Sequence, residues 1–353
     1  MDRSYSLSGK SVLITGGTGS LGRNLAHRLL KEDLCERVII FSRDEWKQWE
    51  MRRSDPLFDS PKVRYFLGDI RDKERLSRAF SDVQVVVHTA ALKQVPAAEY
   101  NPSEFVKTNI LGAMNIIDAA IDRDVERVLA LSSDKSVNPI NLYGATKLCS
   151  DKIFIAGNAY VGKNERPLFS VVRYGNVLES RGSVISRWQM LKEAGAKSLS
   201  ITHKEMTRFW LTLDQAATFV EKCLLEMQGE EIYIPKIPSM KIVDLAEAVA
   251  PGLSHEYIGI REGEKLHEIL INSDESFHAF DCGDHYVILP PVYKKDLDRR
   301  LAERKELANP VPEGFTYSSD TNTQWLDRDD LKHLRRLQNS GSVDQEGNPM
   351  LST

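Results

Sequence analysis

The residues with the clearest chemical potential lie in two short segments, Asp134-Lys135 and, eight residues further along, Tyr143-Gly-Ala-Thr-Lys147. A spacing of four places Tyr143 and Lys147 on one helix face, where the ammonium can hold the phenol near ionisation at neutral pH. Such a pair can move a hydride and a proton together. Asp134 and Lys135 add an acid and a second amine, which indicates that redox is only one step of the chemistry. The same Tyr–Lys spacing also occurs on solvated helices, so the surrounding elements must decide.

The segment before Asp134 predicts where these residues lie. Residues Val128–Ser133 form an apolar run that is typical of a buried parallel strand. Asp134 and Lys135 therefore fall at its carboxyl end, where open α/β sheets bind their ligands. This context favours a functional role for both segments.

A glycine-rich turn near the amino terminus indicates a dinucleotide-binding fold. The apolar strand Ser11–Thr15 is followed at once by Gly16-Gly-Thr-Gly19-Ser-Leu-Gly22 and an amphipathic helix over Leu21–Lys31. Glycines permit a tight turn and let backbone amides approach a pyrophosphate at the positive end of the helix. Without this context the pattern would predict only a flexible turn. The cofactor-binding residues predicted here are Gly16, Thr18, Gly19, Ser20, Leu21 and Gly22.

The end of the next strand, Arg37–Phe41, predicts which dinucleotide binds. Ser42-Arg43-Asp44 follows it, about twenty residues past the last glycine, where the ribose-reading group is expected. A leading acidic residue would favour NAD, whereas a small residue followed by arginine can accept the 2′-phosphate of NADP. NADP is the preferred cofactor. Arg43 could instead be a solvated surface charge, and Asp44 leaves room for NAD.

Two further strands end in residues that suit the rest of a dinucleotide. Val63–Leu67 leads to Asp69, whose carboxylate can accept a hydrogen bond from the adenine amino group. Val83–His88 opens into Thr89-Ala-Ala91, small residues that let a dinucleotide lie against the backbone.

The alternation of strands and helices predicts an α/β protein with a Rossmann-type, doubly wound parallel sheet. It continues through expected strands at Phe169–Arg173 and Glu231–Pro235. We assign residues 1–178 to an NADP-binding domain to which residues 206–240 return, and residues 179–205 and 241–330 to a smaller substrate-binding lobe. Residues 338–353 are rich in Ser, Gly, Asn and Asp and are expected to form a disordered tail.

Composition limits the class of protein. The chain has 353 residues, 41% hydrophobic and 28% charged, with a formal net charge of -4. This suits one large or two ordinary domains, and the absence of a basic tract argues against nucleic acid. No apolar run reaches the ~18 residues of a membrane span, and the polar start is no signal peptide, so we expect a cytoplasmic protein without membrane association. Scattered cysteines and histidines predict neither disulfides nor a metal site.

Taken together, these motifs are similar to those of the extended short-chain dehydrogenase/reductase superfamily. Within it the chain resembles the soluble UDP-N-acetylglucosamine 4,6-dehydratases that invert C5. The resemblance covers nearly all of residues 8–330, and Ser-Asp-Lys ahead of Tyr-x-x-x-Lys is its most restrictive part. The motifs are Thr15-Gly-Gly-Thr-Gly-Ser-Leu-Gly22, Ser42-Arg-Asp-Glu45, Ala90-Ala-Leu-Lys93, Ala98-Glu-Tyr-Asn-Pro102, Ser133-Asp-Lys135 to Lys147, Val172-Arg-Tyr-Gly-Asn-Val177, Ser180-Arg-Gly-Ser183, Met206-Thr-Arg-Phe-Trp210, Arg261-Glu-Gly-Glu-Lys-Leu-His267 and Gln324-Trp-Leu.

The resemblance implies a three-stage reaction. Tyr143, steadied by Lys147, takes part in oxidation at C4 with NADP, and Ser133 hydrogen-bonds the C4 oxygen. Lys135 as a neutral amine removes the C5 proton that the ketone makes acidic, while protonated Asp134 gives its proton to the departing C6 hydroxyl. Hydride returns to C6, and protonation of C5 from the opposite face gives the inverted 4-keto-6-deoxy sugar. The bound NADP is regenerated in each turnover.

The resemblance also implies further contacts. For the cofactor it adds Glu45, Lys47, Gln48, Ile70 and Val177, together with Tyr143 and Lys147. For UDP-N-acetylglucosamine it implies Lys93, Thr108, Tyr143, Asn176, Ser180, Arg181, Gly182, Ser183, Thr202, Arg261 and Glu264, with Arg208 as a further candidate for the diphosphate. Glu179 stands where a small residue is usual, which could alter the fit of the substrate. The relatives imply a homo-oligomer and a place in surface-glycan synthesis, such as that of pseudaminic acid.

Two alternatives stay open. A nucleotide-sugar 4-epimerase would need Tyr143 and Lys147 but would have no use for Asp134 and Lys135 as a pair. A non-catalytic NADP-binding regulator would use the fold without turnover, although such a protein would be expected to lack the tyrosine or the lysine. Retaining dehydratases share much of the pattern, but many of them carry another residue at position 143 and have transmembrane helices.

Overall fold

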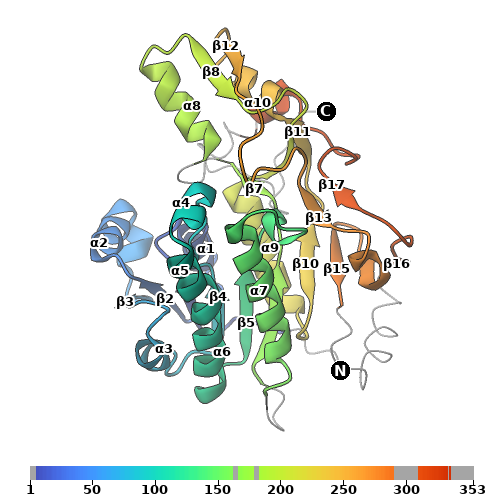
Figure 1. Ribbon diagram of the computed structural model, residues 1–353. Coiled ribbons are helices and arrows are strands. Elements are labelled where there is room, and N and C mark those ends of the chain that lie inside the picture. The colour runs from blue at the N-terminus through green and yellow to red at the C-terminus, as the bar shows by residue number, and fades with distance from the viewer. Residues whose placement is uncertain (1–4, 162–165, 179–182, 290–308, 333, 335–353) are drawn as a thin grey trace.

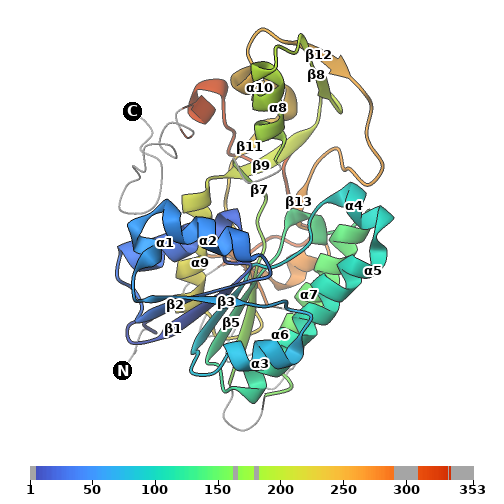
Figure 2. The same cartoon turned by 90° about the vertical axis from the view of Figure 1, so that its left-hand side faces the viewer.

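The computed structural model describes residues 5–161, 166–178, 183–289, 309–332 and 334. A large sheet with helices on both faces forms the body of the molecule, and a smaller lobe lies against one end of it (Figures 1 and 2). The fold class expected from the sequence is confirmed.

The body is built on a sheet that has ten strands within the described residues, in the order β16-β14-β15-β10-β6-β5-β4-β1-β2-β3. From β3 to β10 the strands are parallel, and β15, β14 and β16 add an antiparallel edge. Chain order reverses between β1 and β4, which is where doubly wound sheets open a ligand crevice. The strands are β1 (Ser11–Thr15), β2 (Arg37–Ser42), β3 (Val63–Leu67), β4 (Val85–His88), β5 (Arg127–Leu131), β6 (Leu168–Val172), β10 (Ile232–Pro235), β14 (Ala279–Asp281), β15 (His285–Ile288) and β16 (Asn309–Pro310).

Helices cover both faces of this sheet, as Figure 2 shows. One face carries α1 (Ser20–Lys31), α2 (Glu45–Ser54) and α9 (Leu213–Glu226). The other carries α3 (Lys73–Ala79), α4 (Val95–Tyr100), α5 (Pro102–Phe105), the π-helix η2 (Val106–Leu111), α6 (Gly112–Asp122) and α7 (Leu142–Gly157). Single turns are η1 (Pro56–Asp59) and η3 (Asp134–Ser136).

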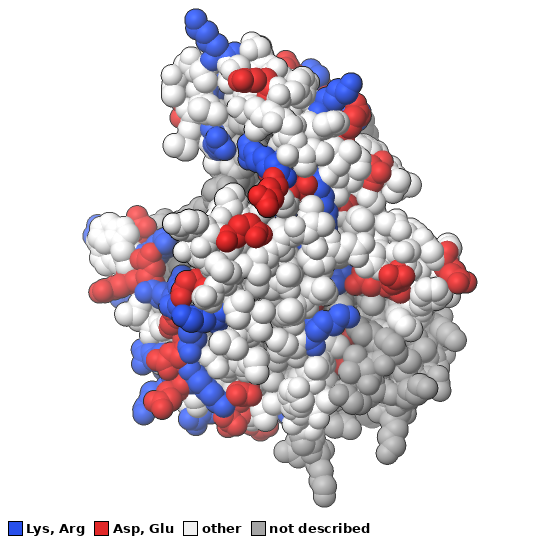
Figure 3. Space-filling model, viewed as in Figure 1, with Lys and Arg blue, Asp and Glu red and all other residues white. Residues whose placement is uncertain are grey.

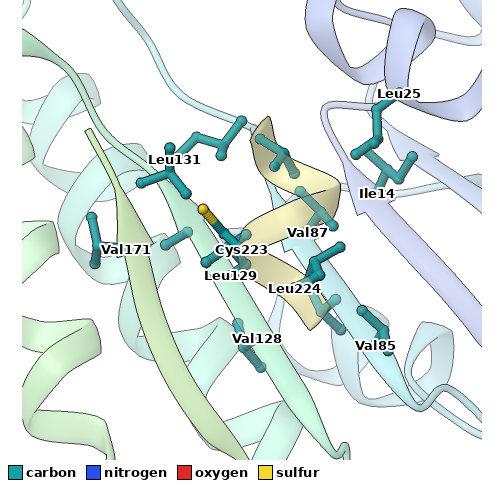
Figure 4. Close-up of a cluster of buried hydrophobic side chains, with 14 of the residues drawn as sticks. Ile14, Leu25, Val85, Val87, Val128, Leu129, Leu131, Val171, Cys223 and Leu224 are labelled. Carbon is teal, nitrogen blue, oxygen red and sulfur yellow. The ribbon is translucent and has the colours of Figure 1, made fainter. Parts of the chain in front are cut away.

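The core explains why the central strands are apolar throughout. Their side chains are covered on both faces, so no polar alternation is needed. In Figure 4, Cys223 and Leu224 of α9 lie against valines and leucines of β4 and β5, with Leu25 of α1 and Ile14 of β1 beside them.

The small lobe has its own core, which includes the buried side chains Trp188, Trp210, Met240 and Leu245. A short sheet, β11-β9-β7, joins it to the body. The elements here are β7 (Asn176–Val177), α8 (Val184–Glu193), β8 (Ser198–Ile201), β9 (Thr207–Leu211), β11 (Ser239–Lys241), α10 (Ile242–Val249) and β12 (Ser254–Tyr257). Three further elements lie against the body: β13 (Ile269–Ile271) and β17 (Tyr317–Ser318) contribute to its core, and η4 (Glu275–His278) contacts β14 and β15.

The structure differs from the expected domain boundaries in two respects. We assigned 241–330 wholly to the lobe, but β14, β15 and β16 extend the large sheet beyond β10. These strands bury Phe280, Val287 and Ile288 in the core of the body and so cover its β10 edge. Of residues 206–240, which the sequence assigns to the NADP-binding domain, α9 and β10 lie with the body, whereas β9 lies in the sheet that joins the lobe. The expected tail, 338–353, lies outside the described residues.

Candidate active site

A cavity of about 1400 Å³ lies between the carboxyl ends of the parallel strands and the small lobe. The surface in Figure 3 is indented between lobe and body, and lysine and arginine side chains lie near this boundary. Both elements that the sequence marked for chemistry, η3 and the start of α7, line the cavity. Its position is the one expected for the ligand site of a doubly wound sheet.

The glycine-rich turn forms one wall, and its shape fits a dinucleotide. A Cβ on Gly16, which has a φ of 66°, would lie 2.9 Å from the Ala90 backbone, and one on Gly22 would lie 2.7 Å from Gly17 Cα. Helix α1 begins at Gly19, which has no side chain to cap it, and its first turn has no acidic residue. This helix end therefore suits an anionic pyrophosphate.

The residues after β2 arrange the next part of the wall. Asp44 caps α2 by accepting from the Lys47 amide at 3.0 Å, and its carboxylate is 2.7 Å from Lys47 Nζ. These contacts lower the pKa of Asp44. Arg43 is half exposed beside the cavity, with Nη1 3.6 Å from Asp69. Both residues line the cavity, Asp44 with its carboxylate paired to its own helix and Arg43 with its guanidinium beside Asp69.

Gln48, which the resemblance implied as a cofactor contact, does not lie in the cavity wall. It is buried and does not line the cavity, because its amide donates to Ser42 O, Ser42 Oγ and Phe66 O. Its role is to fix the ends of β2 and β3 rather than to face a ligand.

Ser133, Asp134 and Lys135 form a connected group at the end of β5. Ser133 Oγ donates to Asp134 Oδ1 at 2.8 Å, and Lys135 Nζ donates to the same oxygen at 3.0 Å. Asp134 is buried, while the Lys135 side chain is 25% exposed to the cavity. An acid and an amine in direct contact, open to one cavity, can exchange a proton and act on neighbouring atoms of a ligand.

Lys135 also faces Glu268, whose Oε1 is 3.4 Å from Nζ. Burial acts to lower the pKa of Lys135, but the carboxylates of Asp134 and Glu268 more than offset it, and the pKa stands above its ordinary value. Lys135 is therefore an ammonium in this arrangement.

Helix α7 presents Tyr143 and Lys147 to the cavity from one face, and both are buried. It begins at Asn141, whose side chain accepts from the Gly144 amide at 2.7 Å. Burial raises the pKa of Tyr143 to about 12, against the lowering effects of Lys135 and a hydrogen bond with Ser133. Lys147 Nζ instead donates to Leu131 O at 2.6 Å, and burial lowers its pKa. Lys135 and Ser133 thus act to lower the pKa of Tyr143, while Lys147, which the spacing predicted for this role, directs its Nζ to Leu131 O.

Gly144 explains how α7 comes so close to η3. A Cβ at this position would lie 2.2 Å from Lys135 O. We expect Gly144→Ala to lower the free energy of unfolding by about 3 kcal/mol, because a backbone carbonyl must move to admit the methyl group. Gly157→Ala, at the other end of α7, is the matched control, since its Cβ would meet only side chains, the nearest at 3.2 Å. Urea unfolding should show a change within about 1 kcal/mol for this control, and equal effects of the two changes would contradict the expectation.

The cavity brings together the sequence-predicted residues with few exceptions. All five predicted catalytic residues and, apart from Gln48, all predicted cofactor residues line it. So do the predicted substrate residues Lys93, Thr108, Asn176, Ser183, Thr202, Arg208, Arg261 and Glu264. Ser180, Arg181 and Gly182, with the departing Glu179, lie outside the described residues.

Arg208 has a different role from the expected one. It is buried, and its guanidinium donates to the carbonyls of Thr207, Lys265 and Leu266. Its Nε lies 3.7 Å from Glu268 Oε1. Most of its donors are taken by the backbone, so it serves the protein interior rather than a diphosphate.

Sequence reasoning missed several residues of the cavity wall, among them Tyr174, Trp210 and Glu268. Glu268 directly follows the last residue of a motif that we had singled out, Arg261 to His267, but nothing in the spacing connects it with Lys135. Four buried polar atoms of the wall lack a hydrogen-bond partner within the described part of the chain: Thr108 Oγ1, Asp134 Oδ2, Trp210 Nε1 and Glu268 Oε2. Buried polar atoms without a partner are rare, so their concentration in residues of this wall calls for an explanation.

The described residues contain neither a metal-binding cluster nor a helix that could cross a membrane. No group of three His, Cys, Asp or Glu side chains there is arranged to hold a metal ion. None of the described helices combines the length and apolar character that crossing a bilayer requires.

Comparison with known proteins gives a consistent result. Residues 12–290 match the family described as polysaccharide biosynthesis protein. A Campylobacter jejuni protein named UDP-N-acetylglucosamine 4,6-dehydratase (inverting) is 52% identical over 327 residues, which cover 92% of this chain and 97% of the relative. A Rickettsia bellii protein named UDP-glucose 4-epimerase is 38% identical over 336 residues, 92% of this chain and 95% of its own.

Solved structures agree on the fold. The X-ray structure of Pen from Bacillus thuringiensis is 33% identical, with a TM-score of 0.84 over 94% of this chain and 98% of that one. The dTDP-glucose 4,6-dehydratase DesIV from Streptomyces venezuelae, solved with NAD and TYD bound, is 22% identical with a TM-score of 0.66 over 72% of this chain and 86% of its own, and shows the fold alone.

The fold, the glycine-rich turn and the Tyr–Lys pair define an extended short-chain dehydrogenase/reductase. More narrowly, this chain belongs to the polysaccharide biosynthesis protein family, among the relatives of the inverting UDP-N-acetylglucosamine 4,6-dehydratases.

Proposed function

We propose that this protein is a UDP-N-acetylglucosamine 4,6-dehydratase that inverts C5. The products would be UDP-2-acetamido-2,6-dideoxy-β-L-arabino-hex-4-ulose and water. The observation that carries the proposal is the contact between Asp134 and Lys135, 3.0 Å apart in the cavity wall beside Tyr143. An epimerase needs the tyrosine but has no step that uses such an acid–amine pair. The activity would belong early in surface-glycan synthesis, such as that of pseudaminic acid.

The chain's own residues carry the proton transfers. Tyr143 accepts the proton of the C4 hydroxyl, which Ser133 orients through its own hydroxyl. Lys135 removes the C5 proton, the C5–C6 double bond forms, and Asp134 protonates the C6 oxygen as it leaves as water. Protonation of C5 on the opposite face then fixes the inverted centre, and the protons balance because Tyr143 gives up the proton that it took from the C4 hydroxyl. A bound nicotinamide dinucleotide supplies the acceptor for the C4 hydride and the donor of the hydride that reaches C6.

The charge state of the resting site must change for this reaction. At rest Lys135 is an ammonium beside the Asp134 carboxylate, whereas elimination needs the amine and the acid. One proton transferred across the 3.0 Å contact gives both. A substrate that fills the cavity removes water, which penalises the ion pair and favours the neutral partners.

For the cofactor we propose NADP, held tightly and recycled in each turnover. Arg43 beside the cavity supports a 2′-phosphate, since a guanidinium matches phosphate geometry. Asp44, whose carboxylate is paired with Lys47, is less available for a ribose hydroxyl. The cytoplasm, where NADP and nucleotide sugars are both found, is the compartment that this chemistry suggests.

We also propose a homo-oligomer. Val106 and Leu111 on η2 and Met114 on α6 are exposed apolar side chains, and Cys149 on the adjacent α7 is exposed as well. In Figure 3 the surface over α5, α6 and α7 is largely free of charged side chains. A face of this kind supports contact with a second copy.

The test is to incubate the purified protein with UDP-N-acetylglucosamine in deuterated water, without added cofactor, and to follow the sugar by proton NMR. We expect a new C6 methyl signal with deuterium at C5, and couplings at C5 that report inversion. Denaturing the same sample should release NADP. Formation of only the galacto isomer would contradict the proposal and favour the epimerase, and an unchanged sugar would favour a non-catalytic binder.

A further inference from the structure

Glu268 is a buried carboxylate that the proposed reaction has not used. Its side chain is 3% exposed and lines the cavity. Oε1 lies 3.4 Å from Lys135 Nζ and 3.7 Å from Arg208 Nε, while Oε2 has no hydrogen-bond partner among the described residues and lies 4.0 Å from Lys265 Nζ. A carboxylate buried with one unpaired oxygen is costly, so its presence here calls for a functional explanation.

The backbone holds Glu268 firmly in this position. The Glu268 amide donates to Ser319 Oγ at 2.9 Å, and the Glu268 carbonyl accepts from the Ser319 amide at 2.8 Å. Ser319 Oγ is in turn 2.7 Å from Thr207 Oγ1 on β9. Arg208, next along β9, fixes the carbonyls of Lys265 and Leu266. The carboxylate is therefore presented to Lys135 from a segment tied at several points.

We propose that Glu268 is a positioning residue for elimination. Its carboxylate holds Lys135 Nζ at the cavity and stabilises the positive charge that Lys135 gains when it takes the C5 proton. The proposal rests on the function proposed above. In this step the C5–H bond breaks and its proton goes to Lys135, the electron pair forms the C5–C6 double bond, and the C6–O bond breaks as Asp134 protonates the oxygen. Asp134 faces Lys135 as a neutral acid before the step, so Glu268 is then the carboxylate beside the base among the described residues.

The sign of the effect on pH dependence follows from the groups around Lys135. These are Asp134 on η3, Tyr143 on α7, Lys93 after β4, Arg208 on β9, and Lys265 and Glu268 before β13. The reactive site keeps one proton shared between Lys135 and Asp134, and activity is lost when that proton leaves at high pH. Glu268 raises the proton affinity of Lys135, whereas Arg208, Lys93 and Lys265 oppose it. Removing the Glu268 charge should let the proton leave at lower pH.

The experiment compares wild-type enzyme with Glu268→Gln over a range of pH, using UDP-N-acetylglucosamine and the C6 methyl signal. We expect kcat of E268Q to fall about 10-fold to 100-fold at neutral pH, with KM little changed. The alkaline limb of the kcat profile should move to lower pH by about one unit. Glu268→Asp, which keeps the charge, should restore the alkaline limb.

Glu275→Gln is the matched control, because Glu275 pairs at 3.0 Å with the buried Arg173 and does not line the cavity. It should leave the alkaline limb unchanged, whatever it does to stability. An unmoved limb in E268Q, or an equal shift in E275Q, would overturn the proposal.

A second measurement separates this inference from the proposed function. If the wild-type protein makes no C6 methyl product, the proposed function fails. The effect of the Glu268 charge on the proton affinity of Lys135 can then be tested separately. Trinitrobenzenesulfonate reacts with neutral amines, and mass analysis of the Lys135 peptide measures the labelling. Labelling of Lys135 should begin at lower pH in E268Q than in the wild type, and identical profiles would overturn the role of Glu268.

Discussion

Lys135→Met should abolish dehydration while leaving oxidation at C4 in place. Methionine has nearly the length of lysine but no amine, so the cavity keeps its shape and loses its base. We expect formation of the C6 methyl product to fall about 10³-fold, the middle of the range for a lost acid–base group. The C5 proton should cease to exchange with deuterated water, because that exchange requires its removal.

Oxidation at C4, the step before elimination, shows whether the variant has lost only the base. Tyr143 and Ser133 are unchanged in the variant, so near-ultraviolet absorbance of reduced nicotinamide should still rise when substrate is added. The Lys135 ammonium helps to lower the pKa of Tyr143, so this rise should be slower at neutral pH than in the wild type. Methyl product at more than about a tenth of the wild-type rate would show that Lys135 is not the base.

Much of the body of the fold could be predicted because it depends on local patterns. The parallel strands β1 to β6 and β10 are apolar runs, since both faces of the sheet are covered, and each lies within about two residues of its expected range. The antiparallel edge could not be predicted in the same way. Strands β14 and β16 have three and two residues, too short for a periodic signal. The pairs that attach this edge, β14 with β16 and β15 with β10, join segments distant in sequence.

The site residues divide in the same way, into those set by local sequence patterns and those set by long-range contacts. Ser133, Asp134, Lys135, Tyr143 and Lys147 were found because two adjacent elements, a strand end and a helix start, carry all of them. Glu268 meets Lys135 only because β9 and Ser319 bring a segment from far along the chain against η3. The direction of a single side chain could not be predicted from the sequence either. The spacing of Tyr143 and Lys147 predicts their shared helix face, but packing decides that Lys147 Nζ turns to Leu131 O.

Tyr143→Phe should stop the reaction before the first hydride moves. The substitution keeps the ring and removes the phenol oxygen that accepts the proton of the C4 hydroxyl, together with its hydrogen bond with Ser133. We expect the rate of C4 oxidation to fall about 10³-fold or more. Reduced nicotinamide should not accumulate, the C5 proton should not exchange, and no methyl product should form. This outcome differs from that of Lys135→Met, which should retain the absorbance change.

Tyr174→Phe provides the matched control, because Tyr174 is a second tyrosine of the same cavity wall and its own backbone carbonyl accepts from the Asp134 amide at 3.0 Å. Burial raises the pKa of both phenols, but only for Tyr143 do Lys135 and a hydrogen bond with Ser133 act against it, whereas the nearby Tyr143 raises the pKa of Tyr174 further. The control should stay within about ten-fold of the wild-type rate, since it loses only a neutral hydroxyl. If the two tyrosine variants lost activity equally, the cavity wall as a whole, rather than the Tyr143 phenol, would account for the effect. If Tyr143→Phe still exchanged the C5 proton, C4 oxidation could not depend on this phenol, because that proton becomes acidic only beside the ketone.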